Sequence, residues 1–247
     1  MKKLAVMTSA ALMAAVGFAD GIQSANVVGY TTKSNTVSGF NFYAPSFVSV
    51  GTESVNLQDV KLDFGENECQ GLDNIQILDD GGATVSTYVW MPADWTGLDA
   101  DGWVNEEGTA LADITLAPGQ GILIDIVDDG TSVVNAGEVS DVDASVEAVA
   151  GFNFVGNSSP VAINIQDIKL DFGENESQGL DNIQILDDGG ATVATYVWMP
   201  ADWTGLDADG WVNEEGTALA NITLAPGQGI LVDIVDDGTN IILPSAL

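Results

Sequence analysis

Apolar side chains recur along this chain in short runs that alternate with polar residues or are rich in β-branched residues. Residues 83–90 alternate strictly, so that one face carries Val and Thr while the opposite face ends in Trp90. Residues 121–127 place three isoleucines on one face, and residues 26–32, 74–78 and 113–116 form further short runs. The pattern therefore predicts strands throughout, with Trp90 in the core.

Glycine-rich turns separate these runs, as at residues 79–82, 117–121 and 128–130. The only helix candidates are residues 57–64 and 165–172, each expected to form at most one turn. Many short strands joined by tight turns are typical of an all-β protein. The expected fold is a β-sandwich or a small β-barrel.

The strand pattern occurs twice. Residues 61–131 return at residues 169–239, and 67 of these 71 positions are identical. The four differences are Cys69/Ser177, Ser86/Ala194, Asp113/Asn221 and Ile124/Val232. A unit of roughly 100 residues is long enough to be an independent domain. The sequence therefore predicts two tandem, near-identical domains, at residues 20–137 and 138–247.

The first nineteen residues form a targeting segment. Lys2 and Lys3 precede an apolar stretch that ends in Gly17-Phe18-Ala19, with small residues at the positions that a signal peptidase requires. The alternative is an uncleaved anchor, but the apolar run is short for a span of roughly 20 residues. Residues 1–19 are thus predicted to be a cleaved signal peptide, which indicates a secreted or cell-surface protein with no membrane insertion after cleavage.

Charge excludes several classes of function. The 247 residues carry 37 acidic side chains against five lysines, with neither arginine nor histidine, and the formal net charge is −32. Such a surface repels nucleic acid and anionic membranes. The absence of histidine also removes catalytic triads and imidazole metal sites. The single cysteine, Cys69, excludes an intrachain disulfide.

The order of motifs resembles the all-β repeat modules of secreted bacterial proteins that open with Gly-Trp-Asn-Leu and close with Pro-Gly-x-Gly-Tyr-Trp-Val. Here each copy opens with Gly-Phe-Asn-Phe, at residues 39–42 and 151–154. The second copy closes with Pro-Gly-Gln-Gly-Ile-Leu-Val at residues 226–232, where aliphatic residues replace the aromatic pair. The resemblance implies an exported, non-catalytic module and no active site.

One acidic loop is a candidate calcium site. An EF-hand is excluded, because placing Gly102 at the sixth position puts Gly97 and Gly108 where the first and last carboxylates belong. An irregular oxygen site remains as one interpretation, and a solvated acidic turn is the other. The candidate ligands are Asp99, Asp101, Asn105 and Glu106, with Asp207, Asp209, Asn213 and Glu214 in the second copy. The prediction therefore includes no cofactor except a candidate Ca²⁺.

Paired aspartates form a second acidic feature. They stand in the turns at residues 79–80 and 128–129, and again at 187–188 and 236–237. If their strands are neighbours, four carboxylates gather at one end of each module and repel one another. The alternative is ordinary surface turns.

Tryptophans in the acidic loop are candidates for carbohydrate binding. Trp95 lies in a loop flanked by proline and glycine and is expected to be exposed, whereas Trp103 fits either a loop or the core. Trp203 and Trp211 repeat them. An exposed tryptophan beside carboxylates suits a sugar ring; the alternative is an aromatic side chain folded over the end of the module.

These features favour a non-catalytic structural or interaction protein of the cell envelope or extracellular matrix. In one form of this hypothesis, divalent cations bridge the copies of the protein. The alternative is a bivalent carbohydrate-binding protein, and a less favoured third reading is a carboxylate-dependent glycoside hydrolase. The expected partners are further copies of the chain or a surface polysaccharide.

Overall fold

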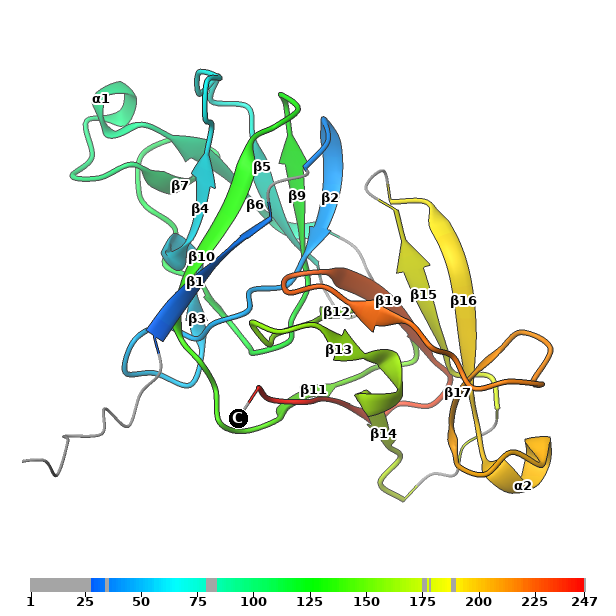
Figure 1. Ribbon diagram of the computed structural model, residues 1–247. Helices are drawn as coiled ribbons and strands as arrows, with labels where there is room; N and C mark the ends of the chain where they lie inside the picture. The colour runs from blue at the N-terminus through cyan, green and yellow to red at the C-terminus, as the bar shows by residue number, and fades with distance from the viewer. Residues whose placement is uncertain are drawn as a thin grey trace, which may run out of the picture.

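The computed structural model describes residues 28–33, 36–78, 84–174, 177, 179–187 and 190–246 (Figure 1). The predicted signal peptide and the turn at residues 79–82 lie outside these residues. Within them the regular secondary structure is almost entirely β-strand, as the alternating pattern predicts. Two four-residue α-helices and two 3₁₀ turns are the exceptions among the described residues.

The first copy forms three antiparallel sheets. A five-stranded sheet has the order β2-β9-β5-β6-β7, a three-stranded sheet the order β1-β10-β4, and β3 pairs with β8. The strands are β1 (Val28–Lys33), β2 (Gly39–Tyr43), β3 (Val55–Asn56), β4 (Val60–Asp63), β5 (Asn74–Leu78), β6 (Thr84–Met91), β7 (Gly102–Asn105), β8 (Thr115–Leu116), β9 (Ile122–Ile126) and β10 (Ser132–Glu138). The short helices are η1 (Leu57–Asp59) and α1 (Ala93–Thr96).

The second copy repeats this arrangement with the sheet orders β12-β19-β15-β16-β17, β11-β20-β14 and β13-β18. Its elements are β11 (Ala144–Glu147), β12 (Gly151–Gly156), β13 (Ile163–Asn164), η2 (Ile165–Asp167), β14 (Lys169–Asp171), β15 (Asn182–Leu186), β16 (Thr192–Met199), α2 (Ala201–Thr204), β17 (Gly210–Asn213), β18 (Thr223–Leu224), β19 (Gly229–Ile234) and β20 (Asn240–Leu243). No sheet contains strands of both copies, and no sheet of the described residues closes into a barrel. The sandwich is thus the correct one of the two predicted folds.

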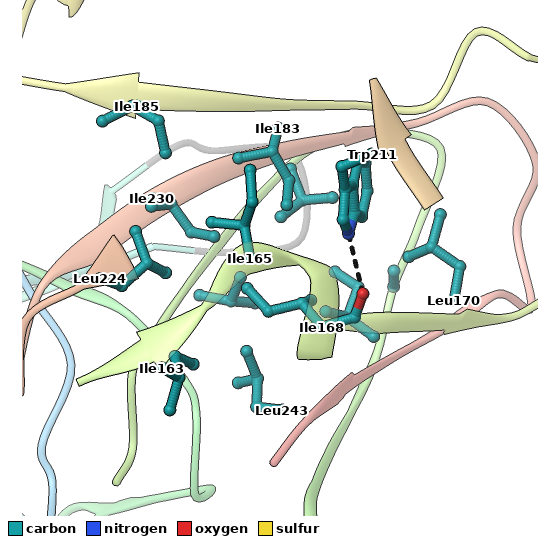
Figure 2. Close-up of a cluster of buried hydrophobic side chains, with 14 of the residues drawn as sticks. Ile163, Ile165, Ile168, Leu170, Ile183, Ile185, Trp211, Leu224, Ile230 and Leu243 are labelled. Atoms are coloured by element: carbon teal, nitrogen blue, oxygen red, sulfur yellow. Dashed lines mark hydrogen bonds between the residues drawn. The ribbon is translucent and has the colours of Figure 1, made fainter. Parts of the chain in front are cut away.

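Each module buries its own core between the five-stranded sheet and the smaller sheets. Figure 2 shows the core of the second module, where aliphatic side chains surround Trp211. The indole Nε1 of Trp211 donates to the carbonyl oxygen of Ile168 at 2.8 Å, which satisfies the one polar atom of that ring. Trp211 also packs edge-to-face on Trp198, with ring centroids 5.2 Å apart. The first module has the same arrangement around Trp103 and Trp90, so the core position predicted for Trp90 is confirmed.

The segments predicted as helix candidates each form a single turn. Asn56 caps η1 by accepting a hydrogen bond from the Gln58 N–H on its side-chain oxygen. The chain then continues directly into β4, because Val60 and Leu62 alternate with polar residues and face the core. Gln58 in turn donates from Nε2 to the carbonyl oxygens of Trp103 and Ala112, and so ties η1 to the loop after β7.

The two modules meet around an approximate two-fold axis. Phe42 in β2 stacks on Phe154 in β12, its counterpart in the second copy, with ring centroids 5.2 Å apart and an interplanar angle of 9°. Figure 1 shows β2 beside β12 and β19 at the centre of the molecule. A residue that stacks on its own counterpart marks an isologous contact, in which both copies use the same surface.

Backbone hydrogen bonds across this contact are also reciprocal. The N–H of Ala44 donates to the carbonyl oxygen of Gly227, and the N–H of Gly156 donates to that of Gly119, both at 3.1 Å. These four residues form two pairs of equivalent positions in the two copies. We refer to Phe42, Ala44, Gly119, Phe154, Gly156 and Gly227 together as the module interface.

Candidate functional site

Trp95 lies in α1 and exposes 57% of its surface, as the loop position predicts. Trp203 lies in α2 with the same exposed fraction. The loops before β5 and β15 each carry an exposed leucine that the sequence analysis did not single out: Leu72 at 61% and Leu180 at 62%. The exposed tryptophans and leucines add apolar surface to an otherwise acidic protein.

The ring of Trp95 rests on the backbone of Gly71. A Cβ atom at Gly71 would lie 2.9 Å from Cζ3 of Trp95, and at Gly179 it would lie 2.6 Å from Cζ3 of Trp203. Only glycine allows this close approach. We call Gly71, Leu72 and Trp95 the Trp95 head, and Gly179, Leu180 and Trp203 the Trp203 head. The Gly-Leu pair between two strands is the sequence signal that could have revealed the second half of each head.

Local hydrogen bonds hold α1 in place. The chain enters at Pro92 in an extended conformation and leaves at Gly97 with φ 74°. The side-chain oxygen Oδ1 of Asp101 accepts from the Ala93 N–H at 2.7 Å, and the Gly97 N–H donates to the Ala93 carbonyl oxygen. The turn that carries Trp95 is therefore fixed at both ends. Asp209 and Ala201 repeat the first bond in the second copy at 2.8 Å.

Trp103 and Trp211 are not available to a ligand. Both are fully buried, and the indole Nε1 of Trp103 donates to the carbonyl oxygen of Val60. Their proposed role in carbohydrate binding is therefore wrong for the folded protein. The sequence did not decide whether Trp103 lies in a loop or in the core, because its strand, β7, is only four residues long and follows a long loop.

The candidate calcium ligands do not converge. In the described part of the chain, no group of three or more acidic or cysteine side chains is arranged to hold a metal ion. Asp101 is engaged with α1, and Asn105 Oδ1 accepts from the N–H groups of Thr109 and Ala110. Asp99 and Glu106 are exposed.

The equivalent residues of the second copy make the same contacts. Asp209 accepts from Ala201, Asn213 accepts from Thr217 and Ala218, and Asp207 and Glu214 are exposed. In both acidic turns Asp and Asn stabilise the backbone, and the calcium site stays a prediction.

The paired aspartates are partly described, and Asp128, Asp129 and Asp237 each bond to another loop. Asp129 Oδ1 accepts from the Ser38 N–H at 2.6 Å, and Asp237 Oδ1 accepts from the Ala150 N–H at 2.7 Å. Asp128 accepts from Gln70 Nε2 at 2.5 Å. Residues 79, 80 and 188 lie outside the described part. These contacts tie the turn after β9 to the start of β2, and its counterpart to the start of β12.

Each module also has one buried carboxylate that the sequence analysis did not identify. Asp73 and Asp181 are each only 2% exposed, and each Oδ1 accepts a backbone N–H, from Val127 at 2.9 Å and from Val235 at 3.0 Å. Burial raises the pKa of both carboxyl groups, and the received hydrogen bond opposes that rise. Each aspartate also accepts a backbone bond on its carbonyl oxygen, from Trp90 or Trp198. Each aspartate therefore ties the residue after the Gly-Leu pair of its head to β6 or β16 and to the turn after β9 or β19.

Comparison of the chain with models of protein families found no match, and comparisons with curated proteins and with solved structures found none either. The resemblance to Gly-Trp-Asn-Leu modules therefore stays a prediction. No helix in the described part of the chain is long and apolar enough to cross a membrane.

Proposed function

We propose that this protein is a non-catalytic, exported component of the cell envelope or extracellular matrix that binds polysaccharide through its Trp95 and Trp203 heads. The observation that carries the proposal is the exposure of an indole ring on a rigid turn, backed by a glycine that an exposed leucine follows in the chain. A fixed aromatic ring loses little conformational entropy on binding, so its contact area converts efficiently into affinity.

The chemistry of each head suits an uncharged sugar chain. A pyranose ring has an apolar C–H face that covers an indole, while its hydroxyl groups remain at the rim. Asp94 precedes Trp95 in α1, and Asp99 follows in the next loop; both are exposed and offer carboxylate oxygens to those hydroxyl groups. The net charge of −32 disfavours polyanions. We therefore expect uncharged polysaccharides to bind and acidic ones such as alginate not to bind.

Fluorescence titration tests this proposal. The full chain is titrated with hydroxyethyl cellulose, dextran and arabinoxylan, each separately, and with alginate as the acidic comparison. Emission of the exposed indoles should change with at least one uncharged polysaccharide, and the change should be lost in the double variant Trp95→Ala/Trp203→Ala.

Phe40→Ala is the matched control, because Phe40 is a half-exposed aromatic side chain outside both heads. It should titrate as the unchanged protein does. A protein that binds none of the three uncharged polysaccharides contradicts the proposal, as does a double variant that binds normally.

A second candidate function, self-association, is favoured by β1. This strand forms one edge of its sheet and pairs with β10 alone among the described strands. Val28 is 64% exposed and Tyr30 is 74% exposed along it. An exposed apolar edge is a template for pairing with another chain.

Light-scattering mass measures this self-association. The mass should rise with protein concentration, and Tyr30→Lys should abolish the rise, because an edge lysine disfavours pairing. The same measurement in EDTA and in millimolar Ca²⁺ at matched ionic strength tests the cation-bridged version. A constant monomer mass in both solutions would remove this second candidate.

A further inference from the structure

The two heads stand at opposite ends of the molecule. α1 and α2 lie at the two far extremes in Figure 1, with the module interface between them. The sheet order explains this placement. In the first module β2 contributes to the interface and β7 is the opposite edge strand, and the chain passes through α1 immediately before β7.

The strand spacing gives the scale of the separation. Four inter-strand steps of about 4.8 Å put roughly 19 Å between β2 and β7, and the same holds between β12 and β17. Because the sheets meet near β2 and β12, the heads are on the order of 40 Å apart. An approximate two-fold axis turns them to opposite sides. A single sugar chain would have to fold around the protein to reach both.

The connection between the modules is held firmly. The module interface combines a stacked phenylalanine pair with reciprocal backbone hydrogen bonds, and Tyr43 is buried beside Gly227. Only residues 139–143 join β10 to β11. A linker of five residues keeps the effective concentration of one module near the other in the millimolar range. The heads therefore cannot swing to a common side while the interface is intact.

We propose that the protein cross-links two separate strands of an uncharged polysaccharide, one on each head, rather than gripping one strand twice. This inference rests on the proposed function and adds the geometry of the complex to it. Two opposed, equivalent sites on a rigid body join two polymer strands into a network, because neither site competes with the other for the same segment.

A capture assay separates binding from cross-linking. Beads carry one of the three uncharged polysaccharides, the full chain is added below bead saturation, and a fluorescent form of the same polysaccharide follows. The protein retained and the labelled polysaccharide retained are measured separately. The unchanged protein should retain both.

Single-head variants give the decisive readout. Trp95→Ala and Trp203→Ala each keep one head, so bead binding should fall by no more than about twofold. Labelled polysaccharide should fall by about tenfold or more, which corresponds to loss of about 1.4 kcal/mol at the second site. Phe40→Ala should match the unchanged protein in both measurements.

The alternatives give different results. Labelled polysaccharide retained in full by the single-head variants overturns the inference, because bridging would then come from associated chains or from another site. Unchanged protein that binds the beads without retaining labelled polysaccharide also overturns it and leaves the proposed function standing. Absence of bead binding with all three polysaccharides overturns both.

Discussion

The two modules are nearly identical around their heads and cores, yet they differ in the strands that flank their contact. β1 has six residues and pairs along β10, which has seven, whereas β11 and β20 have four residues each. Lys33 opposes Val133 in the first module, and Val146 opposes the equivalent residue, Ile241, in the second. The same sheet order thus tolerates different edge strands.

The filling of the module interface differs in the same way. On one side of the axis the ring of Tyr43 lies against Gly227, and on the other the side chain of Leu243 lies against Gly119. Leu243 occupies the position of Asn135 in the first copy, where the Oδ1 atom accepts from the Phe47 N–H. The symmetric part of the contact is therefore backbone and phenylalanine, while each side is filled by a different large side chain.

Core substitutions should affect both modules equally and give the largest effect. Trp103→Ala and Trp211→Ala each remove a fully buried indole with its hydrogen bond. We expect each to lower the unfolding free energy of its module by about 3–5 kcal/mol. Calorimetric unfolding of the full chain measures this. Clearly unequal losses would show that the two cores are not energetically equivalent.

Substitutions at the interface glycines should rank next. In Gly227→Ala the new Cβ would lie 2.5 Å from Cε2 of Tyr43, and in Gly119→Ala it would meet Leu243. Both residues also have positive φ, 74° and 83°. We expect a loss of about 1–3 kcal/mol from strain and overpacking.

Gly238→Ala and Gly130→Ala are the matched controls for these variants. They have positive φ of 85° and 86°, but no atom lies within 4 Å of the new Cβ. They report the backbone strain alone, so the difference in melting temperature isolates the packing clash. Equal losses in all four variants would contradict the described interface.

Buried aspartates should give a smaller, pH-dependent effect. Burial raises the pKa of the Asp73 and Asp181 carboxyl groups above the ordinary value of 3.8. The folded protein therefore binds a proton on each of these carboxyl groups more tightly than the unfolded chain does. The resulting stability is complete below the unfolded pKa and is lost as pH rises through the folded pKa. Asp73→Asn keeps an oxygen for the Val127 N–H and removes the charge, so it should raise the melting temperature at pH 7 and flatten its dependence on pH.

The control for charge removal exists in the chain itself. Asp113 is exposed and is already asparagine in the second copy, at Asn221. Asp113→Asn removes one charge without touching a buried group. If it flattens the pH dependence of the melting temperature as much as Asp73→Asn does, general charge repulsion rather than burial is responsible.

Head substitutions should have the smallest effect on stability. Trp95 and Trp203 are more than half exposed, so Trp95→Ala and Trp203→Ala should change the unfolding free energy by less than about 1 kcal/mol. Thermal unfolding checks this before any binding experiment. A larger loss would mean that the indole supports α1, and the binding tests would then need Trp95→Phe instead.

Much of the fold could be predicted from local pattern. The strand at residues 83–90 was expected from strict alternation and is observed as β6, and residues 74–78 match β5. The single turns at η1 and η2 were also expected. The ends of strands differ by a residue or so from those expected, because pairing with the neighbouring strand sets them. The strand expected from residue 121, for example, begins at Ile122 as β9. Trp95 was correctly predicted to be exposed because proline and glycine flank its loop.

The candidate sites were predicted less well, for a physical reason. Residues close in sequence, such as Asp99, Asp101 and Asn105, bind a metal only when their side chains converge. Here Asp101 and Asn105 satisfy local backbone N–H groups instead. Trp103 is buried because η1 and β4, more than forty residues earlier, cover it and provide the Val60 carbonyl. Sequence spacing carries no information about such a distant partner.

The sequence by itself determined the strand-rich character, the repetition of one module and the exposure of Trp95, because alternation, duplication and turn residues act locally. Only the tertiary structure decided that Phe42 meets Phe154, that Trp95 rests on Gly71, and that the two heads lie at opposite ends. These results depend on strand order and on packing between modules. Both are set by contacts between residues far apart in the chain, where burial of surface outweighs local preference.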